Sequence, residues 1–117
     1  MFVKETSYFH KVKCYIKENS FIAKLAAKKL CAFSVAIVIG KTIHLHNSSK
    51  QQFINNSRWL KHELVHIKQF QQHGYLPFII KYLWESIRKG YTNNKYEVEA
   101  RAGENNTSIC QDVTILI

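Results

Sequence analysis

One sequence feature constrains the fold more than any other: residues 62–66 are His-Glu-Leu-Val-His. Four residues apart on a helix, the side chains of His62 and His66 lie on one face, roughly 6 Å apart along the axis. Two imidazoles at this separation can bind a single metal ion. Glu63 lies about 100° round the helix, where it can reach a metal-bound water as a general base without being a ligand. Metal-dependent hydrolysis is therefore the leading hypothesis.

The segment around this motif predicts a helix with two different faces. Ser57 is a suitable N-cap, and Gly74 suits the position after a C-terminus near His73. One stripe is apolar and is expected to pack into the core: Leu60, Leu64 and Ile67. A second arc carries only histidine and glutamine: His62, His66, Gln69 and His73. If this arc simply faced solvent, lysine and glutamate would be expected there in so basic a chain. We interpret that arc as functional, with His73 lining the cleft or the helix end.

A metal site of this kind needs a third protein ligand, and few acidic residues are available. The chain has eight Asp and Glu against 17 Lys and Arg, a net charge of +9. Glu97 and Glu99 follow His66 by 31 and 33 residues, a spacing that returns the chain to the metal after one helix. The two acids diverge by about 200° on a helix, so only one can face the metal. Surface pairs with Lys95 and Arg101 are the alternative for both.

The remaining pattern predicts a single α+β domain over residues 1–117, with a short antiparallel sheet, three or four helices and the motif helix at the centre. Residues 11–17 alternate basic and apolar side chains like a half-buried strand. Residues 34–39 and 42–46 are β-branched runs that Gly40-Lys41 joins in a type II′ hairpin. The other expected elements are a helix after Asn19-Ser20, a helical turn at 51–56, helices at 76–88 and 95–103, and a strand or apolar tail at 112–117.

The helix at 76–88 is expected to have Pro77 in its first turn and to end near Gly90. Most of its apolar side chains are expected to pack inward, and Trp84 is expected to fill part of the core: the inward set is Phe78, Ile79, Tyr82, Leu83 and Ile87. Tyr91 and Tyr96 have two interpretations, oxyanion stabilisation and core packing, of which packing is favoured. His44 and His46 alternate on one strand face and are assigned no role.

Hydropathy and cysteine content bear on the compartment. The apolar runs at 31–39 and 75–80 are far shorter than the ~20 residues needed to cross a bilayer, so no membrane span is expected. Residues 1–15 lack the apolar core and cleavage site of a secretory signal, which makes the cytoplasm the expected location. Three cysteines lack C-x-x-C spacing and are expected to be free, buried thiols: Cys14, Cys31 and Cys110.

About half of the chain resembles compact HExxH zinc metallopeptidases of the gluzincin type, particularly small bacterial zincin-like domains. The likeness lies in WLKHELVHIKQ at 59–69, YLWE at 82–85 and NKYEVEAR at 94–101. In such families the ligating glutamate commonly opens an E-x-x-A pattern, and the alanine lets two metal-bearing helices approach closely. This points to Glu97, three residues before Ala100.

The resemblance implies that His62, His66 and Glu97 bind Zn²⁺ and that Glu63 is the general base for a metal-activated water. A peptide or protein is then the expected substrate. Related peptidases often have an aspartate after the alanine, where it orients the histidines, but this chain has Arg101 there.

Two other functions remain as alternatives. One is a basic module that binds nucleic acid or an acidic partner, with Tyr8, Phe9 and Tyr15 interleaved among its lysines: Lys11, Lys13, Lys17, Lys24, Lys28 and Lys29. The other is a zinc-binding scaffold without catalytic activity, because 117 residues leave little chain to build substrate-binding walls. The pattern itself would also arise by chance in roughly 2% of sequences of this composition. No oligomeric state is indicated.

Overall fold

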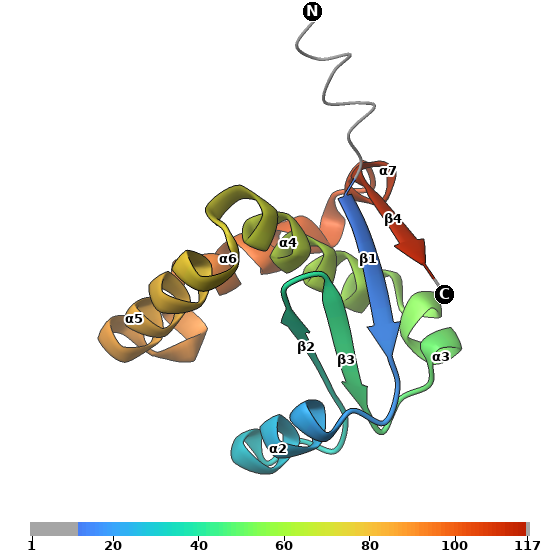
Figure 1. Ribbon diagram of the computed structural model, residues 1–117, viewed down its shortest axis with the longest axis horizontal. Helices are drawn as coiled ribbons and strands as arrows, with labels where there is room; N and C mark the ends of the chain where they lie inside the picture. The colour runs from blue at the N-terminus through green and yellow to red at the C-terminus, as the bar shows by residue number, and fades with distance from the viewer. Residues whose placement is uncertain (1–11, 117) are drawn as a thin grey trace, which may run out of the picture.

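The computed structural model describes residues 12–116. In that range the chain forms an α+β fold with six α-helices and a four-stranded sheet (Figure 1). In chain order the elements are β1 (Val12–Lys17), α2 (Phe21–Leu30), β2 (Val35–Ile39), β3 (Thr42–His46), α3 (Lys50–Asn55), α4 (Ser57–His73), α5 (Tyr75–Asn93), α6 (Lys95–Ala102), a 3-10 turn (Gly103–Asn105), α7 (Ile109–Asp112) and β4 (Val113–Leu116).

The sheet is mixed, which corrects the expectation of a wholly antiparallel sheet. Its strand order is β2-β3-β1-β4, and only the β2–β3 hairpin is antiparallel. β1 runs parallel to both of its neighbours, β3 and β4. Helical connections separate β1 from each of these partners in the chain, and such crossovers return a strand in the same direction. Within the segment at 112–117, Val113–Leu116 form a strand rather than a tail, while Asp112 ends α7.

The expected hairpin at Gly40-Lys41 is confirmed. Ile39 pairs with Thr42 across the two-residue loop, and Gly40 has a φ of 65°. A β-carbon at Gly40 would also lie 3.0 Å from Cε1 of Tyr75, so both the backbone angle and the neighbouring ring favour glycine here.

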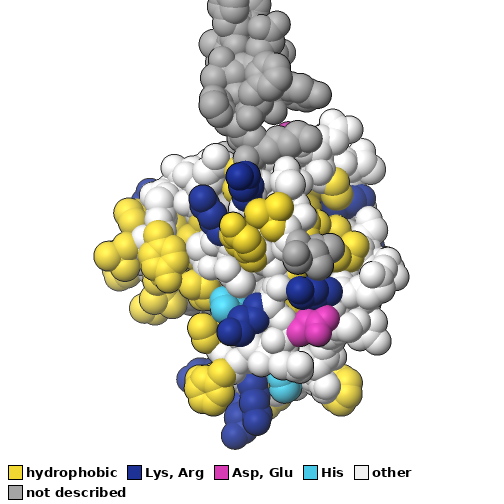
Figure 2. All heavy atoms as spheres, turned by 45° about the vertical axis from the view of Figure 1, so that its right-hand side comes forward, with side chains coloured by type: hydrophobic (Ala, Val, Ile, Leu, Met, Phe, Trp, Pro, Cys, Tyr) yellow, Lys and Arg dark blue, Asp and Glu magenta, His cyan; other side chains and the backbone are white. Residues whose placement is uncertain are grey.

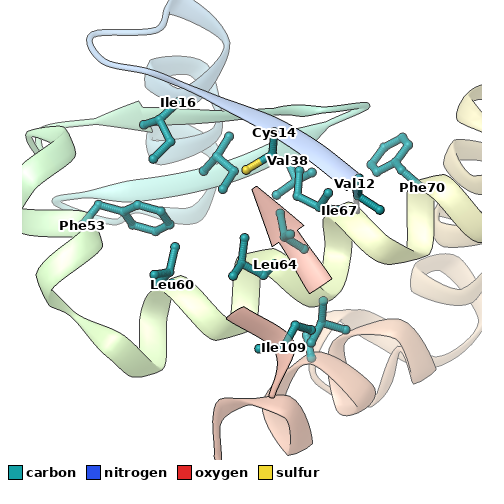
Figure 3. Close-up of a cluster of buried hydrophobic side chains, with 14 of the residues drawn as sticks. Val12, Cys14, Ile16, Val38, Phe53, Leu60, Leu64, Ile67, Phe70 and Ile109 are labelled. Atoms are coloured by element: carbon teal, nitrogen blue, oxygen red, sulfur yellow. The ribbon is translucent and has the colours of Figure 1, made fainter. Parts of the chain in front are cut away.

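The main core lies between the sheet and α4 (Figure 3). The predicted alternation in β1 is confirmed, because Val12, Cys14 and Ile16 are buried while the residues between them are exposed. Leu64 and Ile67 of α4 meet this face and are almost completely buried. Each such aliphatic side chain contributes about 2 kcal/mol on burial. α4 is therefore the central helix, as predicted, and its opposite side is left free for the histidines.

A smaller apolar cluster joins α2 to the other face of β2. Ala23 and Ala27 of α2 pack against Val35, whereas Val38 of the same strand belongs to the main core. The N-cap of α2 is Ser20, as expected, with its side chain accepting a hydrogen bond from the backbone N–H of Ala23. The exposed side of α2 carries Lys24, Lys28 and Lys29.

The boundaries of α4 agree with the prediction to within one residue. Asn56, rather than Ser57, is the N-cap, because its side chain accepts from the backbone N–H of Trp59. Gly74 follows the last helical residue, His73, as expected. The helical turn expected at 51–56 is the short helix α3, which starts at Lys50 behind a capping box formed by Ser49 and Gln52.

α5 differs most from its prediction. It begins at Tyr75 and has a break at Gly90, whose φ is 81° and ψ 166°, where an end was expected. Phe78 is buried and Ile79 and Tyr82 are partly buried, but the other predicted core residues are not. Trp84 is 59% exposed and Ile87 77% exposed, and Leu83 is also exposed. The reason is that α5 packs on α4 and α6 along one side only and extends away from the sheet (Figure 1).

The cysteine prediction was right for Cys14 alone, which is fully buried, while Cys31 and Cys110 are exposed. All three are free thiols, as expected. Burial raises the pKa of the Cys14 thiol to about 11. Among residues 12–116, no helix combines the length and apolar character needed to span a bilayer. The basic and aromatic residues Tyr8, Phe9 and Lys11 lie outside the described range.

Candidate metal centre

α4 and α6 bring three side chains with metal-binding atoms together. His62 and His66, one turn apart on α4, have ring centroids 5.2 Å apart. Glu97 in the first turn of α6 faces both rings, with Oε1 3.0 Å from Nε2 of His62 and Oε2 3.3 Å from Nε2 of His66. The potential ligand atoms of the three residues all lie within 4.8 Å of one another. That separation is small enough for a single ion to contact all three.

The hydrogen bonds of the outer ring nitrogens determine which nitrogen faces the centre. Nδ1 of His62 lies 2.8 Å from Oε2 of Glu104, and a carboxylate can only accept. Nδ1 of His66 lies 2.8 Å from Oε1 of Gln69. The Gln69 amide is fixed in this orientation because its nitrogen donates to the backbone oxygen of Tyr96 and to Glu99. Both rings therefore donate from Nδ1 and direct Nε2 at Glu97. Metal-binding histidines likewise donate a hydrogen bond from the ring nitrogen that does not face the metal.

The centre of the cluster requires positive charge. A neutral ring in this orientation would direct an Nε2 lone pair at the Glu97 carboxylate, so a proton or a cation has to lie between them. Burial opposes a charged His62, but hydrogen bonding to Glu97 and the charge of Glu63 raise its pKa to about 9. Burial likewise acts to raise the pKa of Glu97, but hydrogen bonds from both histidines hold that pKa well below its ordinary value. A divalent ion can replace these protons.

Glu63 is next to this cluster but does not belong to the triad. Its side chain is buried, with 6% of the residue exposed, and it lines the same cavity as the histidines. Burial raises the pKa of Glu63 to about 7, and the nearby histidines act in the opposite direction. A carboxyl group with a pKa near neutrality can both accept and return a proton, which is the requirement for a general base that later acts as an acid.

The turn between α5 and α6 positions Glu97. Asn94 is fully buried, and its side-chain nitrogen donates to the backbone oxygen of Tyr82 and to the hydroxyl of Ser86. Its side-chain oxygen caps α6 by accepting from the backbone N–H of Tyr96 at 2.8 Å. The hydroxyl of Tyr82 also donates directly to Oε2 of Glu97. Two hydrogen bonds that Asn94 donates to α5 thus fix the start of α6, and one that α5 donates fixes the Glu97 carboxylate.

Gly103 lets the end of α6 approach α4 closely. A β-carbon at this position would lie 2.5 Å from Cγ2 of Val65, so glycine is needed at this contact. Ala100, one turn earlier, is fully buried. The close approach places Glu104 against His62, and Arg58 pairs with the same carboxylate at 3.1 Å.

A cavity of about 500 Å³ opens beside the three side chains. Its polar end contains the triad and Glu63, and most of the remaining wall is apolar. The wall comes from α2, the whole of β2, α4 and α5, and includes Leu30, Val35, Val38, Phe78, Ile79 and Leu83. Tyr91 lies at the polar end, where burial and then the charge of Glu97 raise its pKa to about 12. The cavity can therefore receive a largely apolar molecule close to the side chains that could bind the metal.

The structure brings His62, Glu63, His66 and Glu97 to one place, as predicted. Glu99, the alternative to Glu97, instead accepts from the Gln69 side chain at 2.6 Å. Tyr96 is buried in the core, the favoured of its two interpretations, whereas Tyr91 is half exposed beside the site. Three other polar residues are not part of the cluster. Arg101 donates to the backbone oxygen of Thr92, and His44 contacts Ser20. His73, at the end of α4, accepts from Lys81 and stacks on Phe78.

Sequence reasoning missed Glu104, the role of the Tyr82 hydroxyl and the hydrogen bond that His66 donates to Gln69. Glu104 had a partial signal, because it follows Glu97 by seven residues, the spacing of two helical turns, although it lies in the 3-10 turn after α6. Gln69 had one too, at three residues from His66 on the same helix. Tyr82 had none, because its contact depends on how α5 packs.

In comparisons with known proteins, no family model, curated protein or solved structure matches this chain. The function therefore has to be inferred from the geometry of the site.

Proposed function

We propose that the protein is a zinc-dependent metallopeptidase, with His62, His66 and Glu97 as ligands and Glu63 as general base. The observation that carries the proposal is the orientation of the two histidines. Glu104 and Gln69 each accept a hydrogen bond from the Nδ1–H of one histidine, so both Nε2 atoms point at the Glu97 carboxylate, where a proton or a metal cation has to balance the charge. These supporting contacts add to the H-E-x-x-H pattern, which alone would arise by chance in roughly 2% of such sequences.

The donor set suits zinc better than it suits magnesium or calcium. Two imidazole nitrogens and one carboxylate form the His₂Glu set of catalytic zinc sites, which leaves a position for water or substrate, whereas magnesium and calcium prefer oxygen donors alone. When bound, the ion would polarise a carbonyl group and lower the pKa of a water. Glu63 would accept the proton of the attacking water and return it to the departing amine nitrogen.

The edge of the sheet supports a peptide as the substrate. Among the described strands, β2 has a neighbour on one side only, and all five of its residues line the cavity. An edge strand offers unpaired backbone N–H and C=O groups, to which an extended peptide can add as a further strand. Such a peptide would pass the triad with its side chains alternating between the apolar wall and solvent.

The test combines metal analysis with two matched variants of the motif. Glu63→Gln is expected to retain one equivalent of zinc and to lose turnover of a peptide library by at least about a thousandfold, because the proton acceptor is gone. His62→Ala is expected to lose the metal as well as the activity. Mass spectrometry of cleaved peptides and elemental analysis of the purified proteins give the two readouts.

Asp112→Asn is the matched control, since Asp112 is an acid that pairs with Lys68 of α4 and lies outside both the triad and its hydrogen-bonded supports, so this variant should keep both properties. Full activity in Glu63→Gln would contradict the role of Glu63. Stoichiometric zinc without cleavage by the unaltered protein would favour the catalytically inactive scaffold instead.

A further inference from the structure

The outer face of α5 is apolar although nothing in the described chain covers it. Leu76, Ile80, Leu83 and Ile87 are spaced four, three and four residues apart, so they form one stripe along the helix. All four are more than half exposed, and so is Trp84 beside them. The stripe lies on the side opposite to Phe78 and Glu85, the buried residues of α5. Figure 2 shows apolar side chains gathered over this helix, at the left of the view.

The charges around this stripe are almost all of one sign. α5 carries three exposed basic residues, Lys81, Arg88 and Lys89. Its one acid, Glu85, is buried, accepts from the backbone N–H of Lys95 and lies 3.6 Å from Lys89. α2, which forms the opposite wall of the cavity, carries three exposed lysines and no acid. A partner for this face therefore has to combine an apolar interior with a negatively charged surface.

We propose that α5 docks on an anionic lipid surface, lying in the plane of the membrane with Leu76, Ile80, Leu83, Trp84 and Ile87 inserted. Amphipathic helices that lie in a bilayer interface have this composition, with aliphatic and tryptophan side chains on one face and lysine and arginine beside them. A second copy of the chain fits less well, because two chains of charge +9 with basic residues around the stripe repel each other. Nucleic acid satisfies the charge but leaves the aliphatic side chains without a partner.

The docking surface reaches the proposed catalytic cavity. Leu83 belongs both to the exposed stripe and to the cavity wall, and Leu30 of α2 is likewise exposed while lining the cavity. Docking would therefore hold the cavity opening near the lipid. The docking proposal uses no metal ligand, so it stands or fails independently of the peptidase proposal.

Trp84 gives a direct readout in the full chain. The second tryptophan, Trp59, is partly buried against Phe53, so the variant Trp59→Phe leaves Trp84 as the single tryptophan, which can be excited selectively at roughly 295 nm or above, where tyrosine absorbs little. Its emission is expected to shift to shorter wavelength with vesicles of phosphatidylglycerol and phosphatidylcholine, because the indole leaves water. Vesicles of phosphatidylcholine alone should give no shift. Co-sedimentation of the unaltered protein with the same vesicles provides the second measurement.

Two exposed substitutions test the face itself. Ile87→Asp and Arg88→Glu are each expected to weaken vesicle binding by roughly tenfold or more, through lost insertion and lost attraction respectively. The control is Lys13→Glu, which makes the same change of charge on an exposed position of β1. Circular dichroism verifies that all variants fold.

The proposal is overturned if neither vesicle type binds, or if both bind equally and Arg88→Glu has no effect. It is also overturned if Ile87→Asp abolishes a dimer seen by analytical ultracentrifugation, which would assign the face to a second copy. Binding of labelled RNA that survives Ile87→Asp, without vesicle binding, would assign the basic residues to nucleic acid.

Discussion

Each histidine of the proposed metal centre depends on a different acceptor for its orientation. Glu104 holds His62 and is itself paired with Arg58, while Gln69 holds His66 within α4. A carboxylate on the outer nitrogen makes the ring a better electron donor and fixes its tautomer, and loss of such a partner commonly weakens metal binding. Glu104 is therefore the supporting residue whose charge should matter most.

Replacing Glu104 by Gln is expected to weaken zinc binding by about 10- to 100-fold while the fold is retained. Competition with a fluorescent zinc chelator measures the affinity. Asp112→Asn is a suitable control, because Asp112 is also an acid that pairs with a residue of α4, Lys68, but lies away from the histidines. Equal zinc affinity in Glu104→Gln and the unaltered protein would remove Glu104 from the centre.

At this scale the sequence predicts contacts within one helix better than contacts between helices. The spacing of His62 and His66 is a property of α4 alone, so it was predictable. Glu97 was selected over Glu99 through the E-x-x-A pattern, and the structure places Glu97 with the histidines. The bond from the Tyr82 hydroxyl joins α5 to α6 and depends on their packing, which spacing does not encode.

Among the elements, the contact between α4 and the end of α6 leaves the least room for change. Gly103→Ala is expected to lower the free energy of unfolding by about 1–3 kcal/mol, because the added methyl group meets Cγ2 of Val65 at 2.5 Å. Zinc affinity should fall with it, since Glu104 is the next residue. Urea unfolding followed by circular dichroism measures the stability.

The double variant Gly103→Ala, Val65→Ala separates the clash from other effects of the substitution. It restores space at the contact. The loss in free energy of unfolding should therefore be smaller in the double variant than the sum of the losses in the two single variants. Strict additivity of the single effects, or a stable Gly103→Ala protein, would show that the contact relaxes without cost.

Elements were predictable where local signals define them. Capping residues located α2 and α4, and Gly40 located the hairpin, to within a residue. The direction of β1 was not predictable, because a strand pattern is the same in parallel and antiparallel pairing. The buried side of α5 was also not predictable. Its sequence is apolar on two sides, so periodicity alone could not assign Leu83, Trp84 and Ile87 to the exposed one.

For the whole molecule, the proposed metal centre predicts that folding stability depends on pH differently with and without bound metal. Without metal, the raised pKa of His62, about 9 against an ordinary 6.5, means that protonation stabilises the fold fully below pH 6.5. This contribution is lost as the pH rises through about 9. The raised pKa of Glu63, about 7, acts with the same sign at lower pH. The metal-free protein is therefore expected to become less stable from pH 6.5 to 9.

Urea midpoints of chelator-treated protein across this pH range measure the effect. With zinc bound, the ion replaces the proton on His62, so the decline should disappear, and calorimetry in two buffers should detect proton release on zinc binding near pH 7. The control His73→Gln, outside the cluster, should leave the decline of the metal-free protein unchanged. A metal-free protein that gains stability over the same range would contradict the assigned charges.

The hydrogen bonds between α5 and the start of α6 couple the movements of the two helices. The outer side of α5 is the proposed lipid-docking face, while its inner side holds Asn94 through the backbone of Tyr82 and holds Glu97 through the Tyr82 hydroxyl. A tilt of α5 would therefore shift the Glu97 carboxylate relative to the two imidazoles. Docking of the outer face and the position of the Glu97 carboxylate in the proposed metal centre would thus be coupled, with Tyr82 donating a hydrogen bond from α5 to that carboxylate.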